Sequence, residues 1–277
     1  MDEIPQALIE KLQSMTKHDD IKITERCNAS IFAALAITRK LSKRDCILIP
    51  DQGGWISFKN YPKFFGFSVR EVKTDYGVVD LKDLKDKAKD CAALMFTSFA
   101  GYFAEQPLKK ISSICRDNNC LLIEDASGAL GYPKLCNGKY SDMIVGSFSE
   151  GSAVSLGYGG FLSAAKPDYF DMARDVLSIM KVHPAFYYQL LKKLNTKRLK
   201  MVMGLAEKVK DELKGFDIIH KDLEGLNVVV KFKPDILKYC IMNRYPYLLC
   251  PNYNRVNERA VSIELKGLSD KELMKRH

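Results

Sequence analysis

The chain has 277 residues, of which 47% are hydrophobic and 28% are charged, with a formal net charge of +9. This composition excludes a disordered chain, because the apolar side chains suffice for a full core, and the length suits one large domain with a smaller appendage. The positive charge permits contact with nucleic acid or anionic metabolites but by itself indicates neither.

From about Cys27 to Ala165, helical patterns alternate with short apolar runs, which is typical of a parallel sheet covered by helices. Strands are predicted at Cys46–Pro50, Ser68–Val72, Ala92–Thr97, Leu121–Glu124, Met143–Ser147 and Gly160–Ala164. Helices are predicted between them at Ser30–Leu41, Asp80–Ala88 and Leu108–Asn118. Because such sheets bind ligands beyond the carboxyl ends of their strands, functional residues are expected in the loops that follow these runs.

Beyond Pro167 the pattern changes to helices, which are predicted at Tyr169–Lys181 and Ala185–Lys214. In the last stretch strands and helices alternate again. Strands are predicted at Leu226–Phe232, Tyr247–Cys250 and Ala260–Leu265, and helices at Pro234–Met242 and Ser269–Arg276. Its final helix opens on a capping-box pair, Ser269 and Glu272. We therefore expect an α/β fold with a large domain over residues 1–180, followed by a bridging helix and a small α/β C-terminal domain over residues 181–277.

Cysteines, histidines and basic residues indicate no specialised site. The eight cysteines form no CxxC pair and are interpreted as reduced core residues, and the four histidines are scattered, so no metal site is predicted. The basic run between Lys192 and Lys200 is interpreted as a solvated helix face, so nucleic-acid binding is not favoured. No segment has the pattern of a signal peptide or a membrane helix, and we expect a cytoplasmic protein without membrane contact.

Four loops of the predicted large domain carry polar residues at the ends of strands or at the start of a helix. The loop Arg26–Ser30 opens a helix, where free backbone N–H groups favour a phosphate. Asp125 ends an apolar strand at the edge where a sheet meets its ligand. The other two loops are Gly146–Ser149 and the glycine-rich turn Ser155–Gly160. Taken singly, each has an ordinary structural explanation as a helix cap, a capped turn or a strand-end hydroxyl.

In order and spacing, these loops resemble those of the DegT/DnrJ/EryC1/StrS sugar aminotransferases, a family of fold-type I pyridoxal-phosphate enzymes. The resemblance covers roughly residues 25–165. It implies that Asn28, Ala29 and Ser30 form the helix start that binds the cofactor phosphate. It also implies that the serine of a serine-phenylalanine pair, here Ser147, supplies a further phosphate contact.

The same resemblance implies how the cofactor ring is held. Trp55 is similar to the family's aromatic residue that stacks on the ring, and Asp125 would face the pyridine nitrogen and keep it protonated, so that the ring accepts electrons. The fold implied is an aminotransferase-like large domain with a mostly parallel sheet covered by helices, and the cofactor implied is pyridoxal or pyridoxamine phosphate. Because family members form dimers, a homodimer is also implied.

The chain departs from the family at the lysine that forms the imine with the cofactor. Counting forward from Ser147 and backward from the glycine-rich turn both lead to Ser152, and the segment Ser149–Ser155 contains no lysine. The nearest lysines, Lys139 and Lys166, lie outside this loop and are interpreted as solvent-facing. A serine forms no imine and shuttles no proton as an amine does, so ordinary transamination is not expected and any cofactor would be held without a covalent bond.

Three further residues bear on the function without deciding between the possible functions. Glu150 is a candidate for proton transfer, Arg259 is a candidate for binding a substrate carboxylate, and Gly128 stands where the family has a glutamine or histidine near the ring. One hypothesis is an aminotransferase-fold protein that binds pyridoxal or pyridoxamine phosphate, with a further small-molecule ligand. Two alternatives are a pyridoxamine-phosphate-dependent enzyme of another reaction type and a non-catalytic regulatory or heteromeric partner protein.

Overall fold

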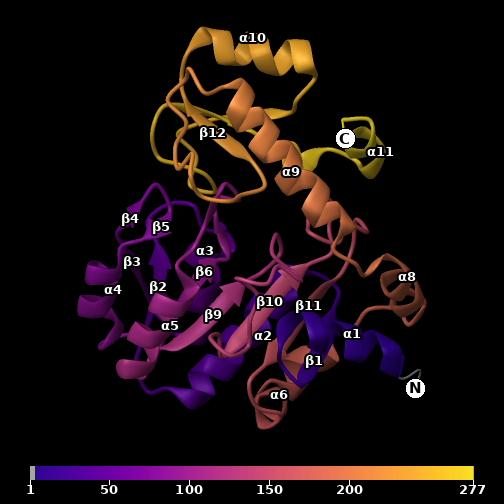
Figure 1. The fold of residues 1–277 in the computed structure, drawn as a ribbon. Helices are drawn as coiled ribbons and strands as arrows, with labels where there is room; N and C mark the ends of the chain where they lie inside the picture. The colour runs from indigo at the N-terminus through magenta and orange to yellow at the C-terminus, as the bar shows by residue number, and fades with distance from the viewer. Residues whose placement is uncertain (1–3, 277) are drawn as a thin grey trace.

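The computed structural model describes residues 4–276, and its centre is a seven-stranded sheet. The strand order is β1 (Asp20–Thr24), β11 (Gly160–Ala164), β10 (Met143–Ser147), β9 (Leu121–Asp125), β6 (Ala93–Thr97), β2 (Cys46–Pro50) and β3 (Ser68–Val72). The five strands from β10 to β3 run parallel, whereas β11 is antiparallel to both β10 and β1. The predicted α/β fold with a mostly parallel sheet is confirmed (Figure 1).

Helices cover both faces of this sheet. On β2, Ile47 and Ile49 pack in one buried cluster and Leu48 packs in another, because successive strand residues point to opposite faces. The Ile47 face is covered by α2 (Cys27–Leu41) with α6 (Asp168–Met172) and α7 (Arg174–Ser178). The Leu48 face is covered by α1 (Gln6–Thr16), α4 (Leu81–Ala88), α5 (Leu108–Asp117) and α8 (Ala185–Lys193).

Short elements fill the connections of the large sheet. A helical turn α3 (Ser57–Asn60) and the 3₁₀ helix η1 (Tyr61–Phe65) follow β2, and two hairpins are formed by β4 (Thr74–Asp75) with β5 (Val78–Val79) and by β7 (Phe99–Ala100) with β8 (Ala104–Glu105). Asp80 is the N-cap of α4, and its side chain accepts hydrogen bonds from two backbone N–H groups of the first turn.

Two helix predictions are wrong in extent, and several elements, among them α1 and β1, were not predicted. The expected single helix Ala185–Lys214 is two helices, α8 and α9 (Lys197–Glu212), because Asn195 turns the chain and its side chain accepts a hydrogen bond from the Lys197 N–H at 2.9 Å. The expected helix Tyr169–Lys181 is divided into α6 and α7. Neither α1 nor the antiparallel edge strand β1 was predicted.

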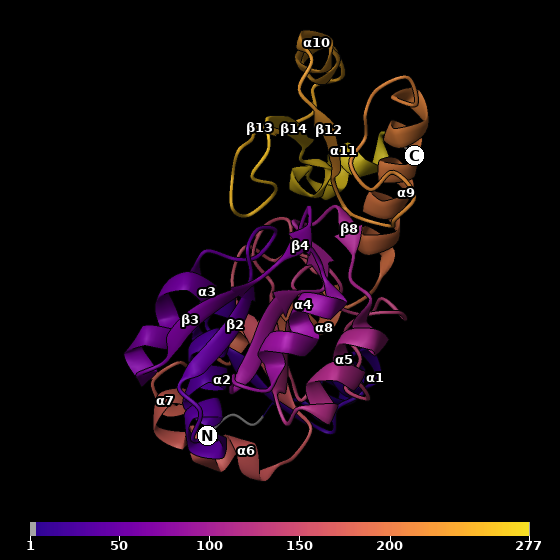
Figure 2. The same cartoon turned by 90° about the vertical axis from the view of Figure 1, so that its left-hand side faces the viewer.

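The C-terminal part is a small three-stranded sheet with helices. Its strand order is β12 (Val228–Lys231), β14 (Ala260–Ile263) and β13 (Tyr247–Leu249), all antiparallel, and it carries α10 (Pro234–Asn243), α11 (Asp270–Met274) and the 3₁₀ helix η2 (Leu265–Gly267). The predicted capping box opens α11. Figure 2 shows this small unit above one edge of the large sheet, with α9 leading up to it. A domain boundary at residue 180 stays a prediction.

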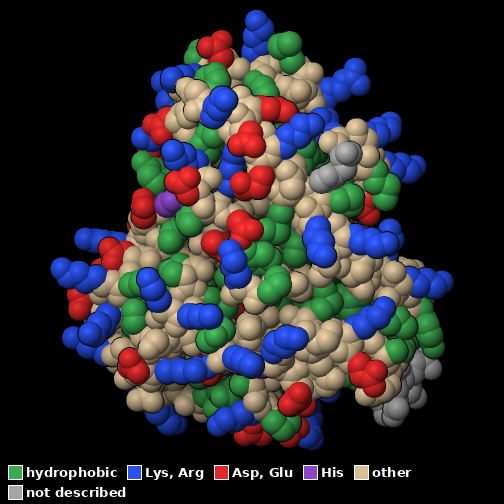
Figure 3. Space-filling model, viewed as in Figure 1, with side chains coloured by type: hydrophobic (Ala, Val, Ile, Leu, Met, Phe, Trp, Pro, Cys, Tyr) green, Lys and Arg blue, Asp and Glu red, His purple; other side chains and the backbone are tan. Residues whose placement is uncertain are grey.

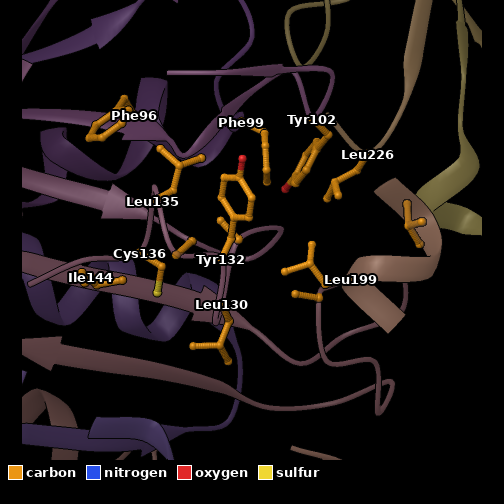
Figure 4. Packing of buried hydrophobic residues seen from close by; sticks show 14 of the residues in the cluster. Phe96, Phe99, Tyr102, Leu130, Tyr132, Leu135, Cys136, Ile144, Leu199 and Leu226 are labelled. Atoms are coloured by element: carbon orange, nitrogen blue, oxygen red, sulfur yellow. The ribbon is translucent and has the colours of Figure 1, made fainter. Parts of the chain in front are cut away.

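Apolar and backbone contacts join the two parts. Figure 4 shows Tyr102, from the loop after β7, beside Leu226, which lies just before β12, with Leu199 of α9 close by. The Tyr102 carbonyl accepts hydrogen bonds from the N–H groups of Leu226 and Asn227 at 2.8 and 3.0 Å. The start of β12 is therefore fixed to a loop of the large sheet.

Charged side chains are spread over the surface. Figure 3 shows lysines and arginines distributed over the visible face with acidic side chains between them. Within the run between Lys192 and Lys200, the lysines are exposed as expected, but Arg198 is 8% exposed, so the interpretation as a solvated face is wrong for this residue. Among residues 4–276, no helix has the length and apolar character needed to cross a membrane.

Candidate functional site

A cavity of about 380 Å³ lies where the carboxyl ends of β9 and β10 meet the start of α2 and the 3₁₀ helix η2. This is the edge at which parallel sheets bind their ligands. The cavity lining includes five residues named from the sequence: Asn28, Trp55, Asp125, Ser147 and Ser152. The structure thus brings residues from distant segments of the chain to one cavity.

Asp125 is the buried acid of the cavity. It is the last residue of β9 and is 4% exposed, and Ser127 donates to its Oδ1 from the backbone N–H at 3.0 Å and from Oγ at 2.6 Å. Burial raises the pKa of Asp125, although these hydrogen bonds and the charge of Lys266 oppose the rise. The neighbouring Glu124 points to the other side of the strand, where it accepts hydrogen bonds from Ser98 and Ser141.

Trp55 is oriented by the first turn of α2. The Asn28 side-chain oxygen accepts hydrogen bonds from Trp55 Nε1 at 3.0 Å and from Ser57 Oγ at 3.1 Å, which leaves its amide N–H groups as donors. Ala29 and Ser30, also predicted as phosphate contacts, are buried and do not line the cavity, and the Ser30 hydroxyl is 2.7 Å from that of Thr24. The helix start therefore presents Asn28 alone of the three.

The loop after β10 places two hydroxyls and a buried serine at the cavity. Ser147 Oγ and Ser149 Oγ are 2.6 Å apart, and the Ser149 N–H donates to Ser147 Oγ at 3.0 Å. Ser152 is buried, and its carbonyl accepts a hydrogen bond from Arg198 Nε at 3.2 Å. Glu150 is exposed and lies at the rim of the same cavity.

Tyr102 occupies the space next to Gly128. A Cβ atom on Gly128 would lie 2.8 Å from Leu226 Cδ1 and 3.2 Å from Tyr102 Cδ1, so a larger side chain at position 128 would clash with both. Tyr102 itself lines the cavity. Tyr102 therefore fills the space beside Gly128 from the loop after the predicted strand Ala92–Thr97, one of the loops in which functional residues are expected.

Lys266 lines the cavity although no sequence pattern indicated it. It belongs to η2, lines the cavity together with Ser152, and holds its Nζ 4.3 Å from the centroid of the Tyr102 ring. Burial and the charge of Arg255 lower the pKa of Lys266 to about 8. By contrast, Lys139 and Lys166 are exposed, as predicted, and do not line the cavity.

Neither Arg259 nor the thiol of Cys27 serves as a reactive group in the cavity. Arg259, predicted to bind a substrate carboxylate, is exposed, does not line the cavity and places its guanidinium 4.4 Å from the centroid of the Phe232 ring. Cys27 does line the cavity, 4.0 Å from Asp125 Oδ1, but burial and this carboxylate raise the pKa of its thiol well above the usual value. Within residues 4–276, no three or more His, Cys, Asp or Glu side chains form a metal site.

The fold and the position of this cavity define a class. The chain has the fold of the fold-type I pyridoxal-phosphate aminotransferases. Particular solved structures with this fold include PseC of Helicobacter pylori, an aminotransferase involved in the biosynthesis of pseudoaminic acid, which is 12% identical with a TM-score of 0.76 over 99% of this chain and 89% of that one. Thermus thermophilus aspartate aminotransferase is 16% identical, with a TM-score of 0.69 over 99% and 80%.

A third solved structure contains a bound cofactor. A serine palmitoyltransferase variant from S. paucimobilis, with bound PLP and myriocin, is 13% identical to this chain, with a TM-score of 0.71 over 98% of this chain and 73% of that one. Residues 196–277 match the MJ1341 family C-terminal domain, a segment that includes Lys266. No curated protein sequence matches the chain. At these identities the likeness establishes the fold alone.

Proposed function

We propose that the cavity binds pyridoxal phosphate or pyridoxamine phosphate, with no covalent bond to Ser152. The observation that carries this proposal is Asp125, a buried carboxylate at the carboxyl end of a central parallel strand, facing a cavity with an aromatic side chain on its wall. A buried acid has a strong preference for a cationic or protonated partner, and a pyridine nitrogen is such a partner.

The remaining lining residues suit the rest of this ligand. The Trp55 indole, fixed by Asn28, offers a flat apolar surface to an aromatic ring, and the hydroxyls of Ser147 and Ser149 offer donors to a phosphate near the start of α2. When bound, the cofactor would supply an electron sink for bonds broken at a substrate carbon. Asp125 would hold the proton on the ring nitrogen, and Ser152 would contribute no amine.

The proposal extends to the second ligand, the cellular compartment and the oligomeric state. The DegT-type resemblance favours an amino or keto sugar as the second ligand, and all eight cysteines are free, which favours a reducing, cytoplasmic compartment. We also propose a homodimer, since two large apolar side chains in the segment that follows Trp55 are exposed: Ile56 is 46% exposed and Phe64 is 72% exposed.

Binding is measurable through a single chromophore. Trp55 is the sole tryptophan of the chain, so intrinsic indole fluorescence reports on this wall of the cavity alone. We expect pyridoxamine phosphate, which carries no aldehyde, to quench the emission saturably. Asp125→Asn removes a charge-assisted hydrogen bond worth about 1.5–3 kcal/mol, so the dissociation constant should rise roughly 10- to 150-fold.

The matched control is Asp168→Asn, which removes an exposed carboxylate that does not line the cavity. This variant should bind pyridoxamine phosphate as the unmodified protein does. Quenching that never saturates, or equal affinities for Asp125→Asn and Asp168→Asn, would show that Asp125 does not hold the ligand and would overturn the proposed function.

A further inference from the structure

The loop after β10 contains no lysine at the position of Ser152, but a lysine from another part of the chain lies beside this loop. Lys266 is the one lysine that lines the cavity among residues 4–276. A Cβ atom added to Gly151, the residue before Ser152, would lie 3.1 Å from Lys266 Nζ. The amine therefore lies against the segment where the sequence resemblance places an imine-forming lysine, although it comes from the other end of the chain.

This position is fixed by a buried arginine. Arg198 of α9 donates from Nε to the Ser152 carbonyl at 3.2 Å and from Nη2 to the Lys266 carbonyl at 2.7 Å. The Lys266 N–H in turn donates to Asn227 Oδ1 at 3.2 Å. One guanidinium thus fastens the loop after β10 to η2, so the side chain of Lys266 enters the cavity from a held backbone.

The surroundings of the amine favour its reactive form. Arg198 and the ion-paired Arg255, whose Nε is 2.7 Å from Glu264 Oε1, place positive charge close to Lys266, and the Tyr102 ring covers it. Burial beside two guanidinium groups penalises the ammonium form. A surface lysine, with a pKa of about 10.4, carries very little neutral amine at pH 7.5.

We propose that Lys266 is the imine-forming lysine of this cavity. It extends from η2 in the C-terminal part to the position at which Ser152 provides no amine. This inference rests on the proposed function, because it takes the aldehyde of pyridoxal phosphate as the reaction partner. It changes the nature of the site from one that only holds the cofactor to one that also bonds to it.

The step is a condensation. The lone pair of the neutral Lys266 Nζ attacks the aldehyde carbon, a C–N bond forms, and the C=O π electrons move to oxygen, which takes up a proton. The resulting hydroxyl takes up a second proton and leaves as water, the nitrogen gives up both protons of the amine over the two stages, and a C=N bond remains. No oxidant or reductant is required. Asp125, which lines the same cavity, holds the ring nitrogen while this bond forms.

The test is reductive trapping with residue-level readout. The full chain is mixed with an equimolar amount of pyridoxal phosphate at pH 7.5, reduced with borohydride, digested and analysed by mass spectrometry. We expect the phosphopyridoxyl group on Lys266 to exceed that on any other lysine by roughly tenfold or more, as its larger neutral fraction predicts. Lys266→Arg, which keeps the positive charge, should abolish this fixed label.

The control and a second ligand separate this inference from the proposed function. Lys166→Arg, at an exposed lysine outside the cavity, should leave the label on Lys266 unchanged. Lys266→Arg should still show saturable quenching of Trp55 by pyridoxamine phosphate, which demonstrates that the variant is folded. If pyridoxamine phosphate binds but the reduced label is absent or scattered over surface lysines, Lys266 is not the imine-forming residue and the proposed function stands. If pyridoxamine phosphate does not bind, the proposed function fails whatever the labelling result, and an absent label overturns both.

Discussion

Asp125 and Lys266 place opposite charges in one cavity, and each shifts the protonation of the other. The charge of Lys266 opposes the rise in the pKa of Asp125, and the charge of Asp125 opposes the fall in the pKa of Lys266. For the amine, burial and Arg255 outweigh this attraction. The pKa of Lys266 is therefore lowered toward neutral pH, while the pKa of the neighbouring Asp125 is raised.

This balance predicts a distinct pH dependence. Acetic anhydride reacts with neutral amines, so labelling of Lys266 should rise with pH around a midpoint of about 8, against about 10.4 for an ordinary lysine. Asp125→Asn removes a negative charge that raises the pKa of Lys266, so the midpoint should move to lower pH. Competitive labelling followed by peptide mass spectrometry measures it, and a midpoint near 10 in the unmodified protein would show that the amine is solvated.

The sequence identified those site residues whose role depends on local position. Asp125 lies at the end of one apolar strand and Trp55 lies in the loop after another, Cys46–Pro50. The rule that ligands bind at the carboxyl ends of parallel strands indicated these loops, and the family resemblance selected the two residues within them. The same rule indicated the loop that ends at Tyr102, after the predicted strand Ala92–Thr97, but Lys266 could not be found in this way. Lys266 follows a strand of a different, antiparallel sheet, and Tyr102 enters the cavity only because the Gly128 backbone leaves space for its ring.

At the scale of elements, α9 acts through Arg198 at its first turn. The guanidinium is 8% exposed and also donates to the Leu268 carbonyl at 2.9 Å and to Asp270 Oδ1 at 2.7 Å. Four acceptors from two distant segments therefore depend on one side chain. The helix was predicted, but its start was placed too early, and an interior arginine looked like part of a solvated face.

Removing this side chain should destabilise the protein. Arg198→Met leaves the buried carbonyls of Ser152 and Lys266 without a donor, and we expect the free energy of unfolding to fall by about 2–4 kcal/mol. Urea denaturation followed by circular dichroism measures the loss. Lys200→Met, on the same helix but at an exposed position, is the comparison and should stay within about 0.5 kcal/mol of the unmodified protein. Equal stability of the two variants would show that α9 is held by its apolar face alone.

Prediction of the elements succeeded where the hydrophobic pattern is continuous and failed where tertiary contacts decide. All six strands predicted for the large sheet are present. Five of them are apolar runs buried on both faces, whereas β3, at the edge of the sheet, is mostly exposed. The edge strand β1, with alternating charged and apolar residues, pairs only with β11 and was not recognised. The break between α8 and α9 depends on the side chain of Asn195, which a helical period does not reveal.

At the scale of the whole molecule, the small unit completes the cavity as well as covering it. The large sheet provides the acid and the aromatic wall, whereas η2 provides the amine, so the site forms only when both parts are docked. The hydrogen bonds from Leu226 and Asn227 to the Tyr102 carbonyl belong to this docking. Aminotransferase-like folds are thus compatible with a reactive amine supplied from the C-terminal sheet.

Assembly is the remaining property that the surface predicts. Phe64 is 72% exposed and lies within 6 Å of the Phe32 ring, centroid to centroid, which makes an apolar aromatic surface next to the Trp55 segment. A self-complementary apolar patch is the usual basis of a two-fold dimer. We expect size-exclusion chromatography with light scattering to give the mass of two chains. Phe64→Glu should raise the dimer dissociation constant by roughly tenfold or more, because it buries an unpaired charge.

Met274→Glu, at a residue 67% exposed on α11, is the matched control and should remain dimeric. A monomeric unmodified protein, or dissociation by Met274→Glu rather than Phe64→Glu, would place the interface elsewhere or remove it, and the cavity would then be complete within one chain.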